Sequence, residues 1–124
     1  MGQIVVPSAG LPGVITPAVL AAGTTQDYAP AGFPAAGVIR QAVNAAGSTI
    51  GGLAGGTEGK VVTFFNISVG GAQTLTFTNE DAGSIAANRF TLPAAGNSTI
   101  SNISSASFRY DSISARWRMS ATTN

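Results

Sequence analysis

The fold class is decided by residues 60–66, KVVTFFN, where β-branched and aromatic side chains stand next to one another. Such residues favour extended backbone and pack well on a pleated surface, so this stretch predicts a buried β-strand. The next stretch, residues 74–78, TLTFT, alternates between hydroxyl and apolar side chains and places Leu75 and Phe77 on one face of a second strand. Together the two stretches predict an all-β chain.

Working outward, the same pattern recurs at residues 37–43, 88–92, 98–103, 106–111 and 116–119. Short strands at this spacing predict a small antiparallel β-sandwich or barrel-like module. Aromatic side chains at alternating positions belong more often to a core than to a sugar-stacking platform. The predicted core consists of Phe64, Leu75, Phe77, Phe90, Phe108, Tyr110 and Trp117.

Glycine-rich stretches separate the predicted strands. Residues 51–57, GGLAGGT, predict a flexible loop, and Gly70-Gly71 predicts the tight turn of a hairpin. The chain accordingly divides into an N-terminal arm at 1–36, a first strand with a glycine-rich connector at 37–57, and a β-sandwich module at 58–124.

The arm has a character of its own. Every proline except Pro93 lies in the first 34 residues, and residues 1–57 carry only two charges, Asp27 and Arg40. Because proline lacks a backbone donor, we expect an extended arm with no regular structure beyond one helical turn at 17–22. It is too apolar for a typical disordered tail, so we expect it to pack on a neighbouring subunit or a partner. The candidate anchors are Val14, Ile15, Val19, Leu20, Tyr28 and Phe33.

The composition excludes several kinds of chemistry. The 124 residues include no Cys and no His, which excludes thiol nucleophiles, disulfides, imidazole bases and the commonest zinc ligands. The net charge of +1 gives no strong field for nucleic acid or anionic membrane, and we expect neither as a partner. Residues 10–23 are uncharged but too short to span a bilayer. Charged residues make up 9% of the chain, which suits a surface that packs against other copies, or a merely low-charge soluble domain.

The few charged residues in the C-terminal half allow two interpretations. The arginines could bind sugar acids or nucleic acid, but the count of acids favours pairing across strands or subunits. Asp111 with Arg116 predicts a clasp across the turn at 112–115. The adjacent carboxylates of Glu80 and Asp81 suit a solvated turn better than a calcium site, because neighbours on an extended chain point apart. The candidate ion-pair or interface residues are Glu80, Asp81, Arg89, Arg109, Asp111, Arg116 and Arg118.

An enzyme is not expected. Lys60 has no Ser-x-x-Lys motif around it, and the glycines at 51–56 lack the Gly-Lys-Ser/Thr core of a phosphate loop. A polysaccharide hydrolase would need two carboxylates at a suitable separation, and the chain has only five acidic residues. We therefore expect no cofactor and no metal.

Residues 58–118 also carry a family resemblance. The elements Asn88-Arg89-Phe90 and Tyr110-Asp111 with Arg116-Trp117-Arg118 resemble a module of tailed-bacteriophage virion proteins, found in distal tail-fibre modules and in small head-fibre or head-decoration proteins. The resemblance implies a virion structural role, commonly with trimeric assembly, and no activity. Because the sequence has no coiled-coil heptads and no repeated shaft, a short surface protein is favoured over a long fibre.

Size supports the same expectation. A β region of about 65 residues without disulfides or metal is marginal alone, so oligomerisation would have to stabilise it. We expect a homotrimer on the surface of a phage particle, produced in the host cytoplasm and acting as a capsid decoration protein bound to capsid or other virion proteins. The alternative is a tail-fibre or receptor-binding tip that recognises host surface saccharide.

Overall fold

A computed structural model describes residues 13–33 and 35–123. The described chain is all-β, with two short 3-10 helices, η1 (Ala86–Asn88) and η2 (Pro93–Ala95). The strands are β1 (Gly13–Ile15), β2 (Thr24–Thr25), β3 (Ala36–Gln41), β4 (Ser48–Ile50), β5 (Val61–Asn66), β6 (Leu75–Phe77), β7 (Phe90–Thr91), β8 (Ser98–Ile100), β9 (Ser105–Asp111) and β10 (Arg116–Thr123).

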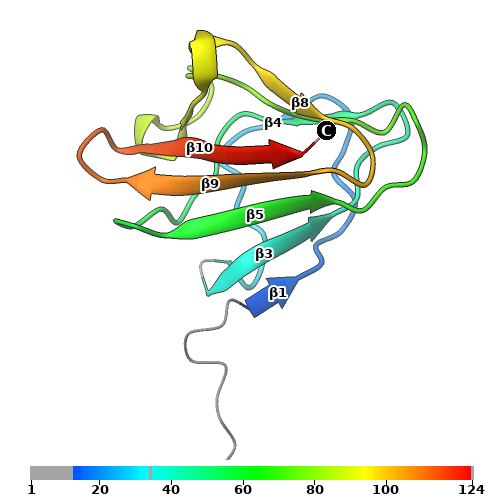
Figure 1. Ribbon diagram of the computed structural model, residues 1–124, viewed down its shortest axis with the longest axis horizontal. Coiled ribbons are helices and arrows are strands. Elements are labelled where there is room, and N and C mark those ends of the chain that lie inside the picture. Colours follow the sequence, from blue (N-terminus) through cyan, green and yellow to red (C-terminus); the bar gives the residue numbers. More distant parts are fainter. Residues whose placement is uncertain (1–12, 34, 124) are drawn as a thin grey trace, which may run out of the picture.

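These strands form two sheets, and the chain alternates between them. The larger sheet has the order β1-β3-β5-β9-β10-β7, and the smaller sheet has the order β2-β4-β6-β8. Figure 1 shows β1, β3, β5, β9 and β10 side by side in one layer. Within β1 to β6 every pairing is parallel, because each short strand is followed by a turn that carries the chain to the other sheet. Each pair of successive strands is therefore one rung of a solenoid-like stack: β1 with β2, β3 with β4, and β5 with β6.

The C-terminal part is built differently. β9 pairs antiparallel with both β5 and β10, and β8 pairs antiparallel with β6. The predicted antiparallel sandwich or barrel is thus corrected to mixed sheets in a solenoid-like arrangement. The predicted hairpin at Gly70-Gly71 is also wrong, because β5 and β6 lie in different sheets.

The first two rungs are an internal repeat, a feature absent from the predictions above. Residues 13–23, GVITPAVLAAG, match residues 37–47, GVIRQAVNAAG, everywhere except at the pairs 16/40, 17/41 and 20/44. The parallel register places Val14 beside Val38 and Ile15 beside Ile39, so matched residues stack on one another. Gly23 and Gly47 end the matched stretches with φ of 85° and 95°, a left-handed conformation that glycine adopts without strain.

One core runs through all three predicted regions. Its buried side chains include Leu20 and Phe33 from the predicted arm, Ile50 and Leu53 from the predicted connector, and Trp117 from the C-terminal module. Four phenylalanines, Phe64, Phe77, Phe90 and Phe108, join the two sheets through ring centroids 4.8–6.0 Å apart.

The predicted arm is therefore wrong from Gly13 onward. β1 and β2 pair with β3 and β4 of the same chain, and the predicted helical turn at 17–22 is not helical. Pro17 and Pro30 are compatible with this arrangement because they lie in the connections between strands, where no ladder donor is needed. Residues 1–12 lie outside the described part of the chain.

The glycines at 51–57 also have a different role from the predicted flexible loop. Gly51, Gly52 and Leu53 are buried, and bridges tie the segment to Tyr28 and Arg89. A Cβ on Gly56 would stand 2.2 Å from the ring of Tyr110. Glycine here allows close packing rather than mobility.

Candidate interaction surface

The outer face of the larger sheet is mostly apolar and hydroxyl-bearing. The strand registers align Val14, Val38, Thr63 and Ser107 in one row that crosses four strands. Val14 is 58% exposed, and the hydroxyls of Thr63 and Ser107 lie 2.7 Å apart. On the same face, neighbouring positions carry the exposed side chains of Val61, Phe65, Arg40, Arg109 and Arg118.

The smaller sheet presents a row of threonines on its outer side. Thr24, Thr49, Thr76 and Thr99 pair in register across all four of its strands. The hydroxyls of Thr76 and Thr99 are 2.8 Å apart. Their neighbours along the strands, such as Ile50 and Phe77, point the other way into the core. This row carries no charge and no aromatic ring.

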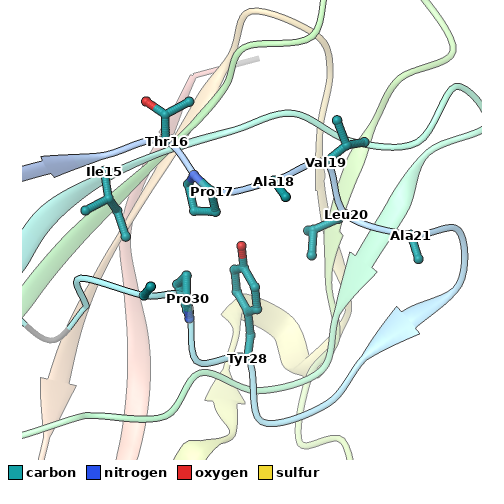
Figure 2. A pocket seen from close by; sticks show the side chains of 10 residues that line it. Ile15, Thr16, Pro17, Ala18, Val19, Leu20, Ala21, Tyr28 and Pro30 are labelled. Atoms are coloured by element: carbon teal, nitrogen blue, oxygen red, sulfur yellow. The ribbon is translucent and has the colours of Figure 1, made fainter.

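The first rung encloses a hollow of about 440 Å³ at the free end of the stack. Its lining includes Ile15 to Ala21 on one side and Tyr28, Pro30 and Ala31 on the other, all from the first rung. In Figure 2 the Tyr28 ring stands between these two sides with its hydroxyl directed toward the segment of Pro17 and Ala18. β1 and β2 are the edge strands of their sheets, so no described strand covers this end.

A buried amide fixes the hollow to the second rung. Gln41 is fully buried; its Nε2 donates to the carbonyls of Ala18 at 3.0 Å and Ala42 at 2.8 Å, and its Oε1 accepts from the Tyr28 hydroxyl. Burial raises the pKa of Tyr28 to about 12, so its hydroxyl stays protonated and serves as a donor at neutral pH.

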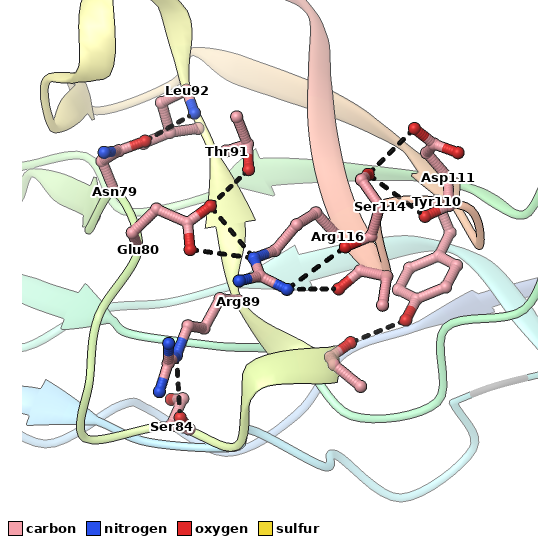
Figure 3. Close-up of polar contacts among 12 residues, drawn as sticks. Asn79, Glu80, Ser84, Arg89, Thr91, Leu92, Tyr110, Asp111, Ser114 and Arg116 are labelled. Carbon is pink, nitrogen blue, oxygen red and sulfur yellow. Dashed lines mark hydrogen bonds and ion pairs between the residues drawn. The ribbon is translucent and has the colours of Figure 1, made fainter.

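Glu80 and Arg116 form a local network with Thr91 and nearby carbonyls, seen in Figure 3. The Nε of Arg116 donates to both Glu80 oxygens, at 2.8 and 3.0 Å, and its Nη1 donates to the carbonyls of Ser114 and Ala115. A hydrogen bond from Thr91, and then the contact with Arg116, hold the pKa of the Glu80 carboxyl below its ordinary value. This network joins the turn at 78–81 to β7 and β10.

The clasp predicted between Asp111 and Arg116 does not form between their side chains. The two residues face each other in the register of the β9–β10 hairpin, but the Asp111 carboxylate accepts from the Ser114 hydroxyl at 2.9 Å and from Arg118 at 3.0 Å. These hydrogen bonds lower the pKa of Asp111. Arg116 reaches Glu80 instead, because the Glu80 carboxylate lies beside β7, the other neighbour of β10.

Asp81 and Arg89 also have defined contacts, and Arg109 lies at the surface. The Asp81 carboxylate accepts from the backbone N–H of Gly83 at 2.8 Å and from the Gln26 amide at 3.1 Å. Arg89 donates to the Ser84 carbonyl at 3.0 Å. Arg109 is exposed on the outer face of the larger sheet.

Two further carboxylates, for which no role is predicted above, hold the fold together. Asp27 accepts from the backbone N–H of Ile85 at 2.8 Å and from Asn88 at 2.9 Å. Glu58 accepts from both the hydroxyl and the backbone N–H of Ser112, which lower its pKa. All five carboxylates are thus engaged in structural hydrogen bonds. Among the described residues, no group of three or more acidic side chains could hold a metal ion.

The structure places the other predicted residues as follows. All seven candidate core residues are buried. Among the arm anchors, Leu20 and Phe33 are buried in this chain's own core, Ile15 and Tyr28 pack against it, and Val14 and Val19 are exposed. The anchors therefore act mainly within the chain.

The sequence carries a signal for Gln41, though not for the hollow. Gln41 shares the inward side of its strand with Ile39, and a polar residue there requires buried hydrogen-bond partners. Comparison of the two matched stretches also shows Pro17 where the second rung has Gln41.

The sequence matches no protein-family model and no curated protein. In the part of the chain that the structure describes, no helix has the length and apolar character needed to cross a membrane.

Proposed function

We propose that the protein is a structural component of a bacteriophage particle, a capsid decoration protein that assembles as a homotrimer on the head surface. The observation that carries the proposal is the contrast between occupied carboxylates and open surfaces. Each acidic side chain is engaged in holding loops and strands, whereas both outer sheet faces and the end of the first rung present mostly uncharged side chains.

This distribution suits assembly better than catalysis. A general acid would need a carboxylate whose pKa is raised, and the pKa values of Glu58, Glu80 and Asp111 are all lowered. Surfaces made mostly of apolar and hydroxyl side chains, in contrast, associate at a low cost of desolvating charges, and here that cost is confined to Arg40, Arg109 and Arg118 on the larger sheet. The resemblance of residues 58–118 to phage virion modules points the same way.

The second candidate is a tail-fibre or receptor-binding tip that recognises saccharide. The threonine row of the smaller sheet favours it, because hydroxyls can hydrogen-bond sugar hydroxyls. Most sugar sites also stack an aromatic ring on the sugar, and the core candidates Phe77, Phe108, Tyr110 and Trp117 are buried.

Copy number and position on purified particles test the proposal. Quantitative mass spectrometry should find hundreds of copies, and gold-labelled antibody should mark the head. A few trimers at the tail would support the tip instead, and no particle-bound protein would reject both. Light scattering on the purified chain should give three times 12.3 kDa.

A further inference from the structure

We infer that the open end of the first rung receives Ile4-Val5-Val6 of a second copy, added as a parallel strand beside β1. The inference rests on the proposed assembly of several copies and names the contact that links them. It starts from the repeat, the free edges of β1 and β2, and the hollow between them.

The repeat shows what this edge is built to receive. Val38 and Ile39 of the second rung are covered by Val14 and Ile15 of the first, in parallel register. Because the first rung repeats the sequence of the second, its free edge offers nearly the same backbone and side-chain pattern that the second rung offers to it. An exposed edge of this kind pairs readily with another strand.

The hollow beside that edge is lined mostly by apolar side chains. Its lining includes Ile15, Pro17, Val19, Leu20 and Pro30, and the Tyr28 hydroxyl is already occupied by Gln41. Terminal repeats of solenoids usually have a polar outer face, whereas residues 13–23 carry no charge. An apolar segment is therefore the fitting occupant.

Residues 1–12 contain such a segment. Ile4, Val5 and Val6 are three consecutive β-branched residues, the type most enriched in strands. Pro7 follows them and favours extended geometry at Val6. Elsewhere, Val69, Ile85, Ile103 and Ile113 are single exposed residues in turns and loops, and Val61 and Phe65 are exposed on the outer face of β5, away from this edge.

Connectivity then decides which copy supplies the strand. A parallel strand pair in one chain needs a crossover of roughly a dozen or more residues. Only residues 7–12 separate Val6 from Gly13, where β1 begins. The segment can reach its own β1 only as an antiparallel hairpin, so a parallel strand on this edge comes from a neighbour. Repeating the contact around three copies closes a ring.

Engineered thiols test the contact, because the chain has no native cysteine. One set of chains carries Ile4→Cys, Val5→Cys or Val6→Cys, since the register is open. The other set carries Val14→Cys together with a tag that changes its size; Val14 lies on β1 and is 58% exposed. The two sets are unfolded, refolded together and oxidised, and the mixed disulfide is measured on a non-reducing gel.

The matched control replaces Val14→Cys by Ile113→Cys. Ile113 is 96% exposed, in the turn between β9 and β10, and β3, β5 and β9 separate β10 from β1. At least one cysteine at position 4, 5 or 6 should form about tenfold more mixed disulfide with the Val14→Cys chain than with the Ile113→Cys chain. The bound segment would hold its thiol near the cysteine at position 14 and so raise the effective concentration of the two thiols. Equal yields would overturn the inference.

Two further measurements separate the remaining outcomes. A chain that carries both Val5→Cys and Val14→Cys should cross-link between chains; a purely intramolecular disulfide would mean a hairpin and reject the inference. Light scattering on the unmodified chain distinguishes a failure of this inference from a failure of the proposed function. A trimer without the mixed disulfide rejects only this contact, and a monomer rejects the trimer as well.

Deletion of residues 2–6 should dissociate the trimer, while the circular dichroism spectrum stays that of a folded β-sheet protein. A trimer that survives the deletion would contradict the inference.

Discussion

The parallel rungs of β1 to β6 and the antiparallel C-terminal part of β8 to β10 share one core but are built by different means. The first two rungs carry only the charges Asp27 and Arg40, repeat a short sequence, and are joined by a buried amide and glycine turns. The C-terminal part has longer strands, one hairpin and the two ion pairs Glu80–Arg116 and Asp111–Arg118. The comparison teaches that both parts fill the shared core with large side chains, Phe64 and Phe77 from the rungs and Phe108 and Trp117 from the C-terminal part. They differ in strand direction and in the use of ion pairs.

The largest effect is expected at that shared core. Trp117 is fully buried, donates its Nε1–H to the Leu53 carbonyl at 2.8 Å, and packs against Tyr110 and Phe33. Trp117→Ala should lower the free energy of unfolding by about 3–5 kcal/mol, as measured by urea denaturation. Trp117→Phe, which keeps a ring but loses the donor, should cost less. A loss below ~1 kcal/mol for the alanine variant would contradict the role of Trp117 in the shared core.

A close backbone approach should give the next effect. A Cβ on Gly56 would overlap the ring of Tyr110, whereas one on Gly71 would meet nothing within 4 Å. Gly56→Ala should therefore cost about 1–3 kcal/mol of unfolding free energy, as overpacking does. The matched variant Gly71→Ala should stay within about 0.5 kcal/mol of the parent in the same denaturation experiment. Equal effects would argue that the loop at 51–57 moves freely after all.

Breaking the amide that joins the first two rungs should act locally. Gln41→Leu leaves the Ala18 carbonyl and the Tyr28 hydroxyl without their partner, at a cost of about 1–3 kcal/mol. Hydrogen exchange should speed up at the backbone N–H groups of Leu20 and Tyr28, which pair with the second rung and the segment after it. It should change little at Trp117. Tyr28→Phe removes only one of these hydrogen bonds and serves as the milder control; uniform acceleration across the molecule would contradict a local role.

The smallest effect concerns pH in the C-terminal part. The folded-state pKa of Glu80 lies below its ordinary value of 4.5, so the carboxylate stabilises the fold above that pH. This contribution is lost as the pH falls from about 4.5 through the lower folded pKa. Both side chains of the Glu80–Arg116 pair are partly exposed, so the contribution should not exceed about 1 kcal/mol. Glu80→Gln should flatten the pH dependence of thermal unfolding below pH 4.5, and an unchanged slope would assign the dependence to other carboxylates.

The sequence by itself determined the all-β class and the core. Alternation of apolar and polar residues is a local property, so Phe64, Leu75, Phe77, Phe108 and Trp117 could be placed on inward faces before any partner strand was known. Ion pairing was also predictable for Glu80, Arg116, Asp111 and Arg118, because a chain with so few charges has few alternatives. The partners differ from the predicted clasp: Arg116 pairs with Glu80, and Asp111 pairs with Arg118.

Only the tertiary structure decided which strands are neighbours. Alternation within a strand is the same whether its partner is parallel or antiparallel, so the sequence predicts an arm where the structure has β1 and β2. The hollow, the buried Gln41 and the fit of Gly56 against Tyr110 all arise between segments separated along the chain. Such contacts depend on the stacking of one rung on the next. The repeat alone does not show that its two copies stack; the parallel pairing of Val14 with Val38 does.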